Sequence, residues 1–161
     1  LLYKEGPKGL ALTRQNVPVL EGTKEKADEG VRRGAYVLVE GSKETPDVIL
    51  MATGSEVQLA VEAAQQLESK GIAARVVSVP CLDWFEEQDK EYQEKVLPSE
   101  VTARVSVEAG IAMPWYRWLG SRGRAVSLEH FGASADYQKL YNEFGITTDA
   151  VVAAAHDSLA S

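Results

Sequence analysis

Four large apolar residues, Val-Ile-Leu-Met, follow one another at positions 48–51 without polar alternation. Such a run is typical of a strand whose two faces are both covered by helices. Gly54 ends the run, and Ser55 is then the expected N-cap of a helix, because Gln58 three residues later completes a capping box. From residue 57 to about residue 70, apolar side chains recur every three or four positions, which predicts an amphipathic helix.

A second apolar strand is predicted directly after this helix. Gly71 is suited to the left-handed position beyond a helix end, and Ile72 can make the apolar contact that accompanies it. Residues 73–79 are again mostly apolar and are stopped by Pro80. Strand, helix, glycine and strand form a βαβ unit, so we expect two parallel strands joined by a right-handed crossover.

The remaining pattern predicts further strands and helices of an α/β protein. Residues 41–46 are too few for a helical crossover, so the strand at 36–40 is expected to be antiparallel to the strand at 47–53 and near an edge. The region 21–34 is charged and lacks helical periodicity, which favours a linker on the surface. The other expected strands are 10–13, 102–107 and 125–128, and the other expected helices are a charged helix ending near 97, then 114–119, 137–144 and a last one through 159, capped by Thr147 or Thr148.

Bulk properties exclude several classes of protein. The 161 residues carry a net charge of −7, which disfavours a general nucleic-acid or membrane-surface binder, because both need a basic face. A single cysteine, Cys81, cannot form an internal disulfide, and this fits a reducing, cytoplasmic location. No apolar run reaches transmembrane length. The chain begins at Leu1 rather than at methionine, so we expect it to be a piece of a longer protein.

Motifs for metal binding or nucleophilic catalysis are weak. The two histidines, His130 and His156, are far apart, and no Cys-x-x-Cys or His-Glu-x-x-His pattern occurs. Ser55 lacks the second glycine of a nucleophile elbow. Cys81 has no base nearby in the sequence, so a structural cysteine is favoured, and His130 is better interpreted as an interface or loop residue. We therefore assign no catalytic, cofactor-binding or metal-binding residue.

Two segments could bind an anion. The backbone amides of residues 53–55, at a predicted helix N-terminus, could hold a phosphate, although helix capping alone explains these residues. Arg14, between the end of the predicted strand 10–13 and the amides Gln15 and Asn16, is a candidate anion contact, because ligands gather where strands end in α/β folds. The alternatives for Arg14 are a structural salt bridge or a solvated loop.

Large rings cluster in two places. Trp84 and Phe85 are interpreted as core anchors. Trp115, Tyr116 and Trp118 lie within four residues, and together with Phe131 they suggest a surface that covers another domain or a second subunit. If all of these rings were enclosed in the core of their own domain, this hypothesis would fail.

Five segments in a fixed order resemble the carboxyl-terminal part of a transketolase. They are Ala-Leu-Thr-Arg-Gln-Asn-Val-Pro at 11–18, Val-Ile-Leu-Met-Ala-Thr-Gly-Ser-Glu-Val at 48–57, Ala-Arg-Val-Val-Ser-Val-Pro at 74–80, Val-Glu-Ala-Gly at 107–110 and Phe-Gly-Ala-Ser at 131–134. The resemblance covers nearly the whole chain, from about residue 9 to the final helix. A single motif such as Thr-Gly-Ser-Glu is unspecific, whereas the ordered set is specific.

The resemblance implies a fold and a division of the chain. Residues 1–20 would be the last strand of a preceding pyrimidine-binding domain, 21–35 a linker, and 36–161 the transketolase C-terminal domain. That domain would be a Rossmann-like three-layer α/β/α fold with a mixed, mostly parallel five-stranded sheet and one antiparallel edge strand.

The resemblance also implies an activity for the whole enzyme. A transketolase moves a two-carbon ketol unit from a ketose phosphate to an aldose phosphate, in the pentose phosphate pathway, with thiamine diphosphate and a divalent metal, Mg or Ca. In the family, the arginine that corresponds to Arg14 contacts the phosphate of the sugar substrate. The expected partners are the rest of the chain, a homodimer mate and the sugar phosphate, with neither nucleic acid nor membrane.

What is missing limits the role of this segment. The Gly-Asp-Gly start of the family's diphosphate–metal motif does not occur, and the cofactor-activating glutamate and the histidines of the active site precede this region in the family. We therefore predict a structural and interface domain that is inactive alone. Two alternatives are open: a regulatory binder of nucleotides or other small molecules, and the final domain of another thiamine-dependent enzyme, such as a deoxyxylulose phosphate synthase or a pyruvate dehydrogenase β subunit.

Overall fold

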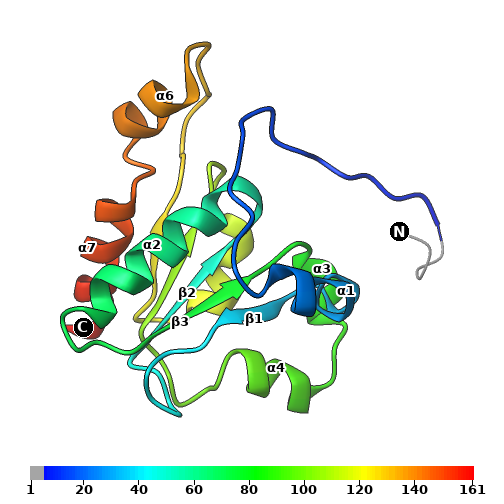
Figure 1. Cartoon of the computed structure of the whole chain (residues 1–161), viewed down its shortest axis with the longest axis vertical. Coiled ribbons are helices and arrows are strands. Elements are labelled where there is room, and N and C mark those ends of the chain that lie inside the picture. The colour runs from blue at the N-terminus through cyan, green and yellow to red at the C-terminus, as the bar shows by residue number, and fades with distance from the viewer. Residues whose placement is uncertain (1–5) are drawn as a thin grey trace.

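A five-stranded mixed sheet forms the centre of the computed structural model, which describes residues 6–161 (Figure 1). The strand order is β1-β3-β2-β4-β5, and all neighbouring pairs are parallel except β1 with β3. The strands are β1 Tyr36–Val39, β2 Val48–Ala52, β3 Ala74–Ser78, β4 Arg104–Val107 and β5 Arg124–Val126. This is the predicted fold class, with its single antiparallel edge strand.

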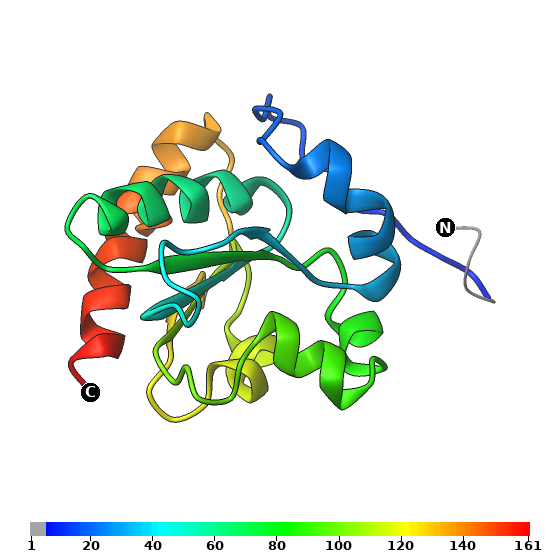
Figure 2. The ribbon, with the colours of Figure 1, turned by 60° about the horizontal axis from the view of Figure 1, so that its bottom comes forward.

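Helices cover both faces of the sheet, as Figure 2 shows. On one face, Val48, Leu50 and Ala52 of β2 pack in a core cluster with α2 (Val57–Glu68) and α7 (Thr148–Leu159). On the other face, Ile49 and Met51 pack with α3 (Leu82–Glu86), α4 (Lys90–Val96), the short turn η2 (Met113–Trp115) and α5 (Tyr116–Leu119). Every residue of β2 is buried, which explains why its sequence shows no polar alternation.

Helix α2 ends as predicted but begins differently. At its end, the N–H of Ile72 donates to the Leu67 carbonyl at 3.1 Å, and Gly71 adopts a left-handed φ of 80°. At its start, residues Gly54–Glu56 form a 3₁₀ turn, η1, and the predicted capping box is wrong. The hydroxyl of Ser55 donates to the Glu56 carboxylate, and the Gln58 side chain donates to the Ser55 carbonyl instead.

Strand β1 is antiparallel to the central strand and lies at the edge, as expected, yet it does not pair with that strand. β3 lies between them, and Tyr36 is opposite Ser78. The short connection 41–46 therefore passes across the end of β3, where the N–H groups of Asp47 and Val48 donate to the carbonyl of Ala73.

The prediction of a surface loop at 21–34 is wrong, because Thr23–Arg33 forms helix α1. Its inward side consists of small residues: Ala27 packs against the core, Gly30 is buried, and the Tyr36 ring lies where a Cβ on Gly30 would project. Ion pairs four residues apart, Arg32 with Asp28 and Arg33 with Glu29, support its outer face.

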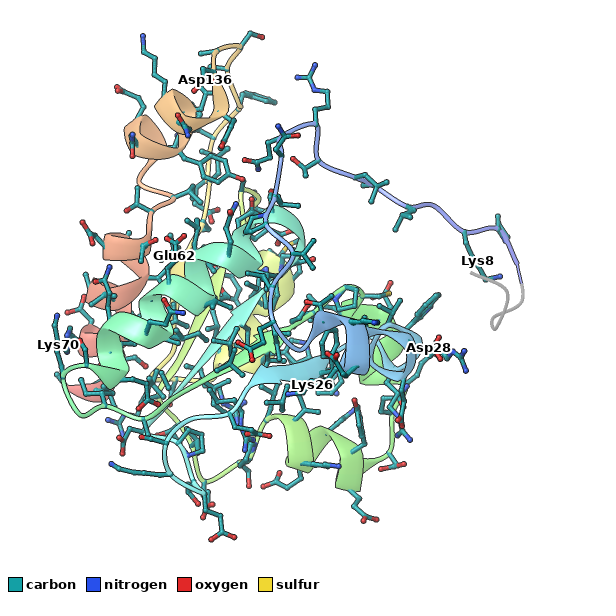
Figure 3. All side chains as sticks on the ribbon, in the orientation of Figure 1. Lys8, Lys26, Asp28, Glu62, Lys70 and Asp136 are labelled. Atoms are coloured by element: carbon teal, nitrogen blue, oxygen red, sulfur yellow. The ribbon has the colours of Figure 1, made fainter. Side chains whose placement is uncertain are left out.

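The predicted strand at 10–13 is also wrong. This segment pairs with no strand of the sheet in residues 6–161, and Leu10 and Leu12 are 67% and 77% exposed. Figure 3 shows the chain near Lys8 at the outside of the molecule, where residues 7–10 line one surface pocket together with Val31 and Trp84. Residues 1–5 lie outside the described part, so the assignment of 1–20 to a preceding domain, of 21–35 to a linker and of 36–161 to the last domain stays a prediction.

The remaining helices follow the sequence with one change. α6 (Tyr137–Phe144) ends at Gly145, and Thr147 caps α7 by accepting a hydrogen bond from the N–H of Ala150, as predicted. The charged helix expected before residue 97 is α4, which the Asp89 side chain caps, and a further short helix, α3, precedes it around Trp84 and Phe85. Within residues 6–161, none of the helices has the length and apolar character needed to cross a bilayer.

Candidate functional site

The carboxyl end of β2 carries a polar cluster that joins three distant parts of the chain. We call it the Glu56 cluster; it consists of Gln15, Ser55, Glu56 and Tyr141. Ser55 and Glu56 belong to the turn η1 after β2, Tyr141 comes from α6, and Gln15 comes from the extended N-terminal segment. It is located where the carboxyl ends of parallel strands place ligands in α/β proteins.

Glu56 is the centre of this cluster. Its residue is only 5% exposed, and its Oε1 accepts hydrogen bonds from Ser55 Oγ, at 2.8 Å, and from the Tyr141 hydroxyl. The Tyr141 hydroxyl in turn accepts a hydrogen bond from Gln15 Nε2 at 3.1 Å. Each hydroxyl thus donates its one hydrogen to the carboxylate, which can only accept.

Burial, together with the hydrogen bond to Glu56, raises the pKa of Tyr141 above its ordinary value. The hydroxyl therefore keeps its proton over the whole neutral range and remains a donor to Glu56. The cluster is a fixed hydrogen-bonded unit at neutral pH.

Arg14 precedes this cluster directly and is exposed to solvent. The N–H of Gln15 donates to Thr13 Oγ1 at 3.2 Å, so Arg14 is at the centre of a small turn whose two ends are linked. Among the residues that the structure describes, no ion pair or side-chain hydrogen bond joins Arg14 to another group. The alternative of a structural salt bridge is therefore not favoured, and the guanidinium is available to an external anion.

The geometry argues against a phosphate site on the amides of residues 53–55. The turn there is a three-residue 3₁₀ segment, and the N–H of Glu56 donates to the carbonyl of Thr53 at 3.2 Å. The Glu56 carboxylate already lies at the N-terminus of α2 and would repel a phosphate.

Cys81 and His130 show no catalytic environment. The Cys81 thiol is half-buried and forms no disulfide. The exposed His130 ring contacts the Phe131 carbonyl through Nδ1 and packs edge-on against Phe144, with ring centroids 4.8 Å apart. Phe85 is a core residue as predicted, with 1% exposure, whereas Trp84 is only half-buried.

The predicted aromatic surface is smaller than expected. Trp115 and Trp118 are buried, at 1% and 8% exposure, in the cluster beneath β2. Tyr116 and Phe131 are 62% and 99% exposed. The hypothesis of a covered surface therefore depends on these two rings alone.

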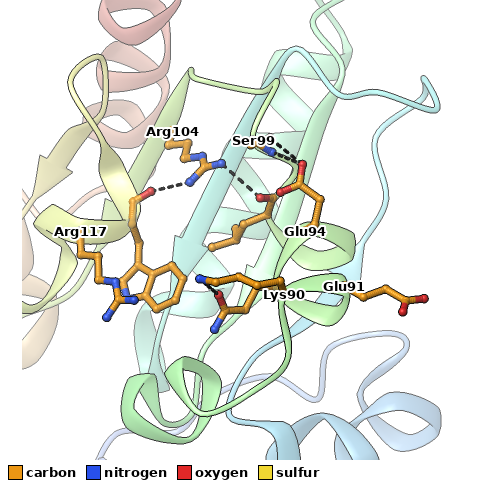
Figure 4. Close-up of a pocket in the computed structure, with 9 residues that line it drawn as sticks. Lys90, Glu91, Glu94, Ser99, Arg104 and Arg117 are labelled. Atoms are coloured by element: carbon orange, nitrogen blue, oxygen red, sulfur yellow. Dashed lines mark hydrogen bonds between the residues drawn. The ribbon is translucent and has the colours of Figure 1, made fainter.

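A surface pocket of about 470 Å³ beside α4 has a structural explanation (Figure 4). The Arg104 guanidinium donates to the carbonyls of Leu97, Pro98, Val101 and Trp118, and its burial lowers its pKa. These bonds satisfy the carbonyls that end α4 and α5. Arg104 is thus occupied by the chain itself and does not mark an anion site.

The residues of this chain do not fit a metal-bound diphosphate cofactor. In the described range 6–161, no three His, Cys, Asp or Glu side chains come close enough to hold a metal ion together.

The sequence pattern did not identify Glu56 and Tyr141 as site residues. Their contact spans 85 positions, and the contact of Tyr141 with Gln15 spans 126. One signal was present: Glu56 lies four residues after the end of a strand that is buried on both faces, so its carboxylate was expected to find donors near the sheet.

Comparison with known proteins gives a consistent result. The sequence profile of the family described as "Transketolase-like TK C-terminal domain" matches residues 34–147. A transketolase from Mycobacterium leprae (strain TN) is 58% identical over 157 residues, which cover 96% of this chain and 22% of that protein. The chain therefore spans about a fifth of the length of this curated relative.

Solved structures have the same fold. A transketolase from Pichia stipitis, in complex with sedoheptulose-7-phosphate, superimposes with a TM-score of 0.78 and 38% identity over 91% of this chain and 20% of that one. A split-gene transketolase, described as an inactive β4 tetramer, superimposes with a TM-score of 0.61 and 27% identity over 80% of this chain and 43% of that one. This chain belongs to the transketolase family and contains the family's C-terminal domain.

Proposed function

We propose that this chain is the C-terminal part of an enzyme that transfers a two-carbon ketol unit from a ketose phosphate to an aldose phosphate. The support is family membership together with the short span of the chain relative to its relatives. Thiamine diphosphate, held with Mg²⁺ or Ca²⁺ by other parts of the enzyme, would supply the chemistry of carbon–carbon cleavage. We place this enzyme in the cytoplasm as a homodimer, in the pentose phosphate pathway.

Within this enzyme, Arg14 binds the phosphate of the sugar. The observation that carries this proposal is the exposed guanidinium at the centre of a linked turn, next to the carboxyl edge of the sheet and without an ion-pair partner among residues 6–161. A planar guanidinium matches a phosphate dianion through two parallel hydrogen bonds, which a lysine cannot reproduce. The sugar phosphate bound to the Pichia stipitis relative is a ligand of this chemical class.

The test is steady-state kinetics of the full-length enzyme with Arg14→Leu and Arg14→Lys. A lost charge-assisted contact of about 1.5–3 kcal/mol corresponds to a rise of roughly 10- to 100-fold in KM for a phosphorylated ketose. Arg14→Lys should recover only part of this loss. An unchanged KM for phosphorylated substrates in Arg14→Leu would overturn the assignment.

The isolated 161-residue chain is proposed to be inactive in ketol transfer. It offers no metal-ligand cluster in its described residues, and the split-gene relative that matches it is described as inactive. The measurement is ketol transfer by the purified chain with thiamine diphosphate and Mg²⁺ added. Turnover above that of the cofactor alone would contradict this part of the proposal.

A further inference from the structure

The segment that carries Arg14 is fastened to the domain through its neighbour Gln15. Residues 7–19 are almost entirely exposed, and Leu12 and Val19 reach 77% and 94% exposure. Gln15, like Lys8, is half-buried, and its Nε2 donates to the Tyr141 hydroxyl at 3.1 Å. This contact determines where the segment passes the carboxyl edge of the sheet.

The contact is directional because of Glu56. Tyr141 can accept the hydrogen bond from Gln15 while donating its own hydrogen to the buried Glu56 carboxylate. A hydroxyl whose hydrogen is already used can only accept, so the Gln15 amide must present its NH₂ group to it. The Tyr141 hydroxyl holds its proton at neutral pH, and burial raises its pKa further above the ordinary value.

The orientation of the Gln15 amide has a further consequence. Its Oε1 is buried and has no hydrogen-bond partner. A buried acceptor without a donor costs free energy, so in the absence of Tyr141 the amide would gain by turning toward water. The hydroxyl of Tyr141 is what holds it inward, and Arg14 is the next residue along the chain.

We propose that Glu56 and Tyr141 are positioning residues for substrate phosphate binding, which act through Gln15 to fix the backbone at Arg14. This inference rests on the proposed phosphate contact of Arg14. The C-terminal domain would then take part in substrate recognition, because Glu56 and Tyr141 anchor the preceding segment, which carries the phosphate-binding residue Arg14. Loss of the anchor changes the affinity for phosphorylated sugars and leaves the chemical step unchanged.

The experiment compares two substrate pairs in the full-length enzyme. One pair is phosphorylated, such as a ketose phosphate with an aldose phosphate, and the other is not, such as hydroxypyruvate with glycolaldehyde. Tyr141→Phe and Glu56→Gln should raise KM for the ketose phosphate about three- to tenfold, the effect of one net hydrogen bond. The kcat for both pairs and the KM for hydroxypyruvate should stay at the wild-type values.

Matched controls are available close to both residues in the chain. Tyr137 packs its ring on that of Tyr141, with ring centroids 6.0 Å apart, but its hydroxyl lies outside the Glu56 cluster. Tyr137→Phe removes this hydroxyl. Glu62→Gln makes the same chemical change as Glu56→Gln, but at a carboxylate of α2 that accepts a hydrogen bond from the Thr148 hydroxyl and lies outside the Glu56 cluster. Both controls should leave every KM unchanged, and thermal unfolding of all variants checks that they fold.

The double variants separate positioning from general damage. In an Arg14→Leu background there is no guanidinium to position, so Tyr141→Phe and Glu56→Gln should add no further rise in KM for the ketose phosphate. An equal rise with and without Arg14 would overturn the inference, as would a rise for both substrate pairs. If Arg14→Leu itself had no effect, the proposed function would fail. If Arg14→Leu raised KM but Tyr141→Phe and Glu56→Gln did not, only the positioning inference would fail.

Discussion

The indole N–H of Trp115 donates a hydrogen bond to the carboxylate of Glu108, with 2.7 Å between nitrogen and oxygen. Glu108 directly follows β4, and Trp115 ends the turn that leads into α5, so this bond closes the loop between them. The Trp115 side chain is also among the largest that are fully buried in residues 6–161. It combines packing with a polar contact, as buried tryptophans usually do.

We expect Trp115→Phe to lower the free energy of unfolding by about 2 kcal/mol, because it leaves a cavity and removes the donor for Glu108. Glu108→Gln keeps an acceptor at the same place and should cost about 1 kcal/mol or less. Urea denaturation followed by circular dichroism measures both. A larger loss for Glu108→Gln than for Trp115→Phe would contradict the view that packing dominates here.

Ser158 on α7 has a hydroxyl that is fully buried and bonded to β4 and to the turn before β5. Its Oγ accepts from the N–H of Arg104, at 3.0 Å, and donates to the carbonyl of Arg122, at 2.9 Å. Ser158→Ala would leave the first N–H of β4 without a partner in the interior, so we expect a loss of about 1–3 kcal/mol in the free energy of unfolding. The control is Ser161→Ala, an exposed serine one turn later, which should cost below about 0.5 kcal/mol.

The central strands were predictable because burial on both faces of a sheet favours a mostly apolar sequence. This held for β2 and β3, whose residues are all buried. The end of α2 was predictable for a similar reason, since only a residue that tolerates a φ of 80° fits at Gly71. These features depend on a few residues that are adjacent in the sequence.

Helix α1 was missed because its stability is not in its hydrophobic pattern. It depends on Gly30, which allows the Tyr36 ring to approach, and on pairs such as Asp28 with Arg32. The charge spacing of four residues and Gly34 after it were present in the sequence and could have indicated a helix. The Glu56 cluster could not have been found in this way, because its members meet only through the fold.

A comparison of Gly34 with Gly145 separates two costs of replacing a glycine, which are backbone strain and steric overlap of the new Cβ. Both adopt a left-handed φ, of 84° and 70°, after a helix end. A Cβ at Gly145 would have open space, whereas a Cβ at Gly34 would lie 2.3 Å from the carbonyl oxygen of Cys81 and 2.4 Å from the nitrogen of Phe85. Those atoms belong to backbone and cannot turn away.

We therefore expect Gly145→Ala to cost about 1–2 kcal/mol from backbone strain alone. Gly34→Ala should cost at least about 1–3 kcal/mol more, because the overlap forces the start of α3 to move. Thermal unfolding of the two variants measures the difference. Equal melting temperatures would contradict the crowding at Gly34.

Asp47 makes stability depend on pH in the acid range. Its pKa lies below the ordinary value of 3.8, first because Lys43 Nζ donates a hydrogen bond to it, and then because the N–H of Ala73 does so at 2.8 Å. A carboxyl whose pKa is lowered in the folded state stabilises the fold above its unfolded pKa, and that contribution disappears as the pH falls through the folded pKa. Stability should thus decrease below about pH 4.

Asp47→Asn should reduce the slope of the unfolding free energy against pH between about pH 5 and pH 3, because the group that binds the extra proton on unfolding is gone. Lys43→Met should flatten it only partly, because the bond from Ala73 to Asp47 remains. Urea denaturation at a series of pH values measures both slopes. Suppose that Lys43→Met reduced the pH dependence of the unfolding free energy as much as Asp47→Asn. The hydrogen bond from the Ala73 N–H to Asp47 would then contribute nothing to it, and the contact between the start of β2 and the start of β3 would not depend on the charge of Asp47.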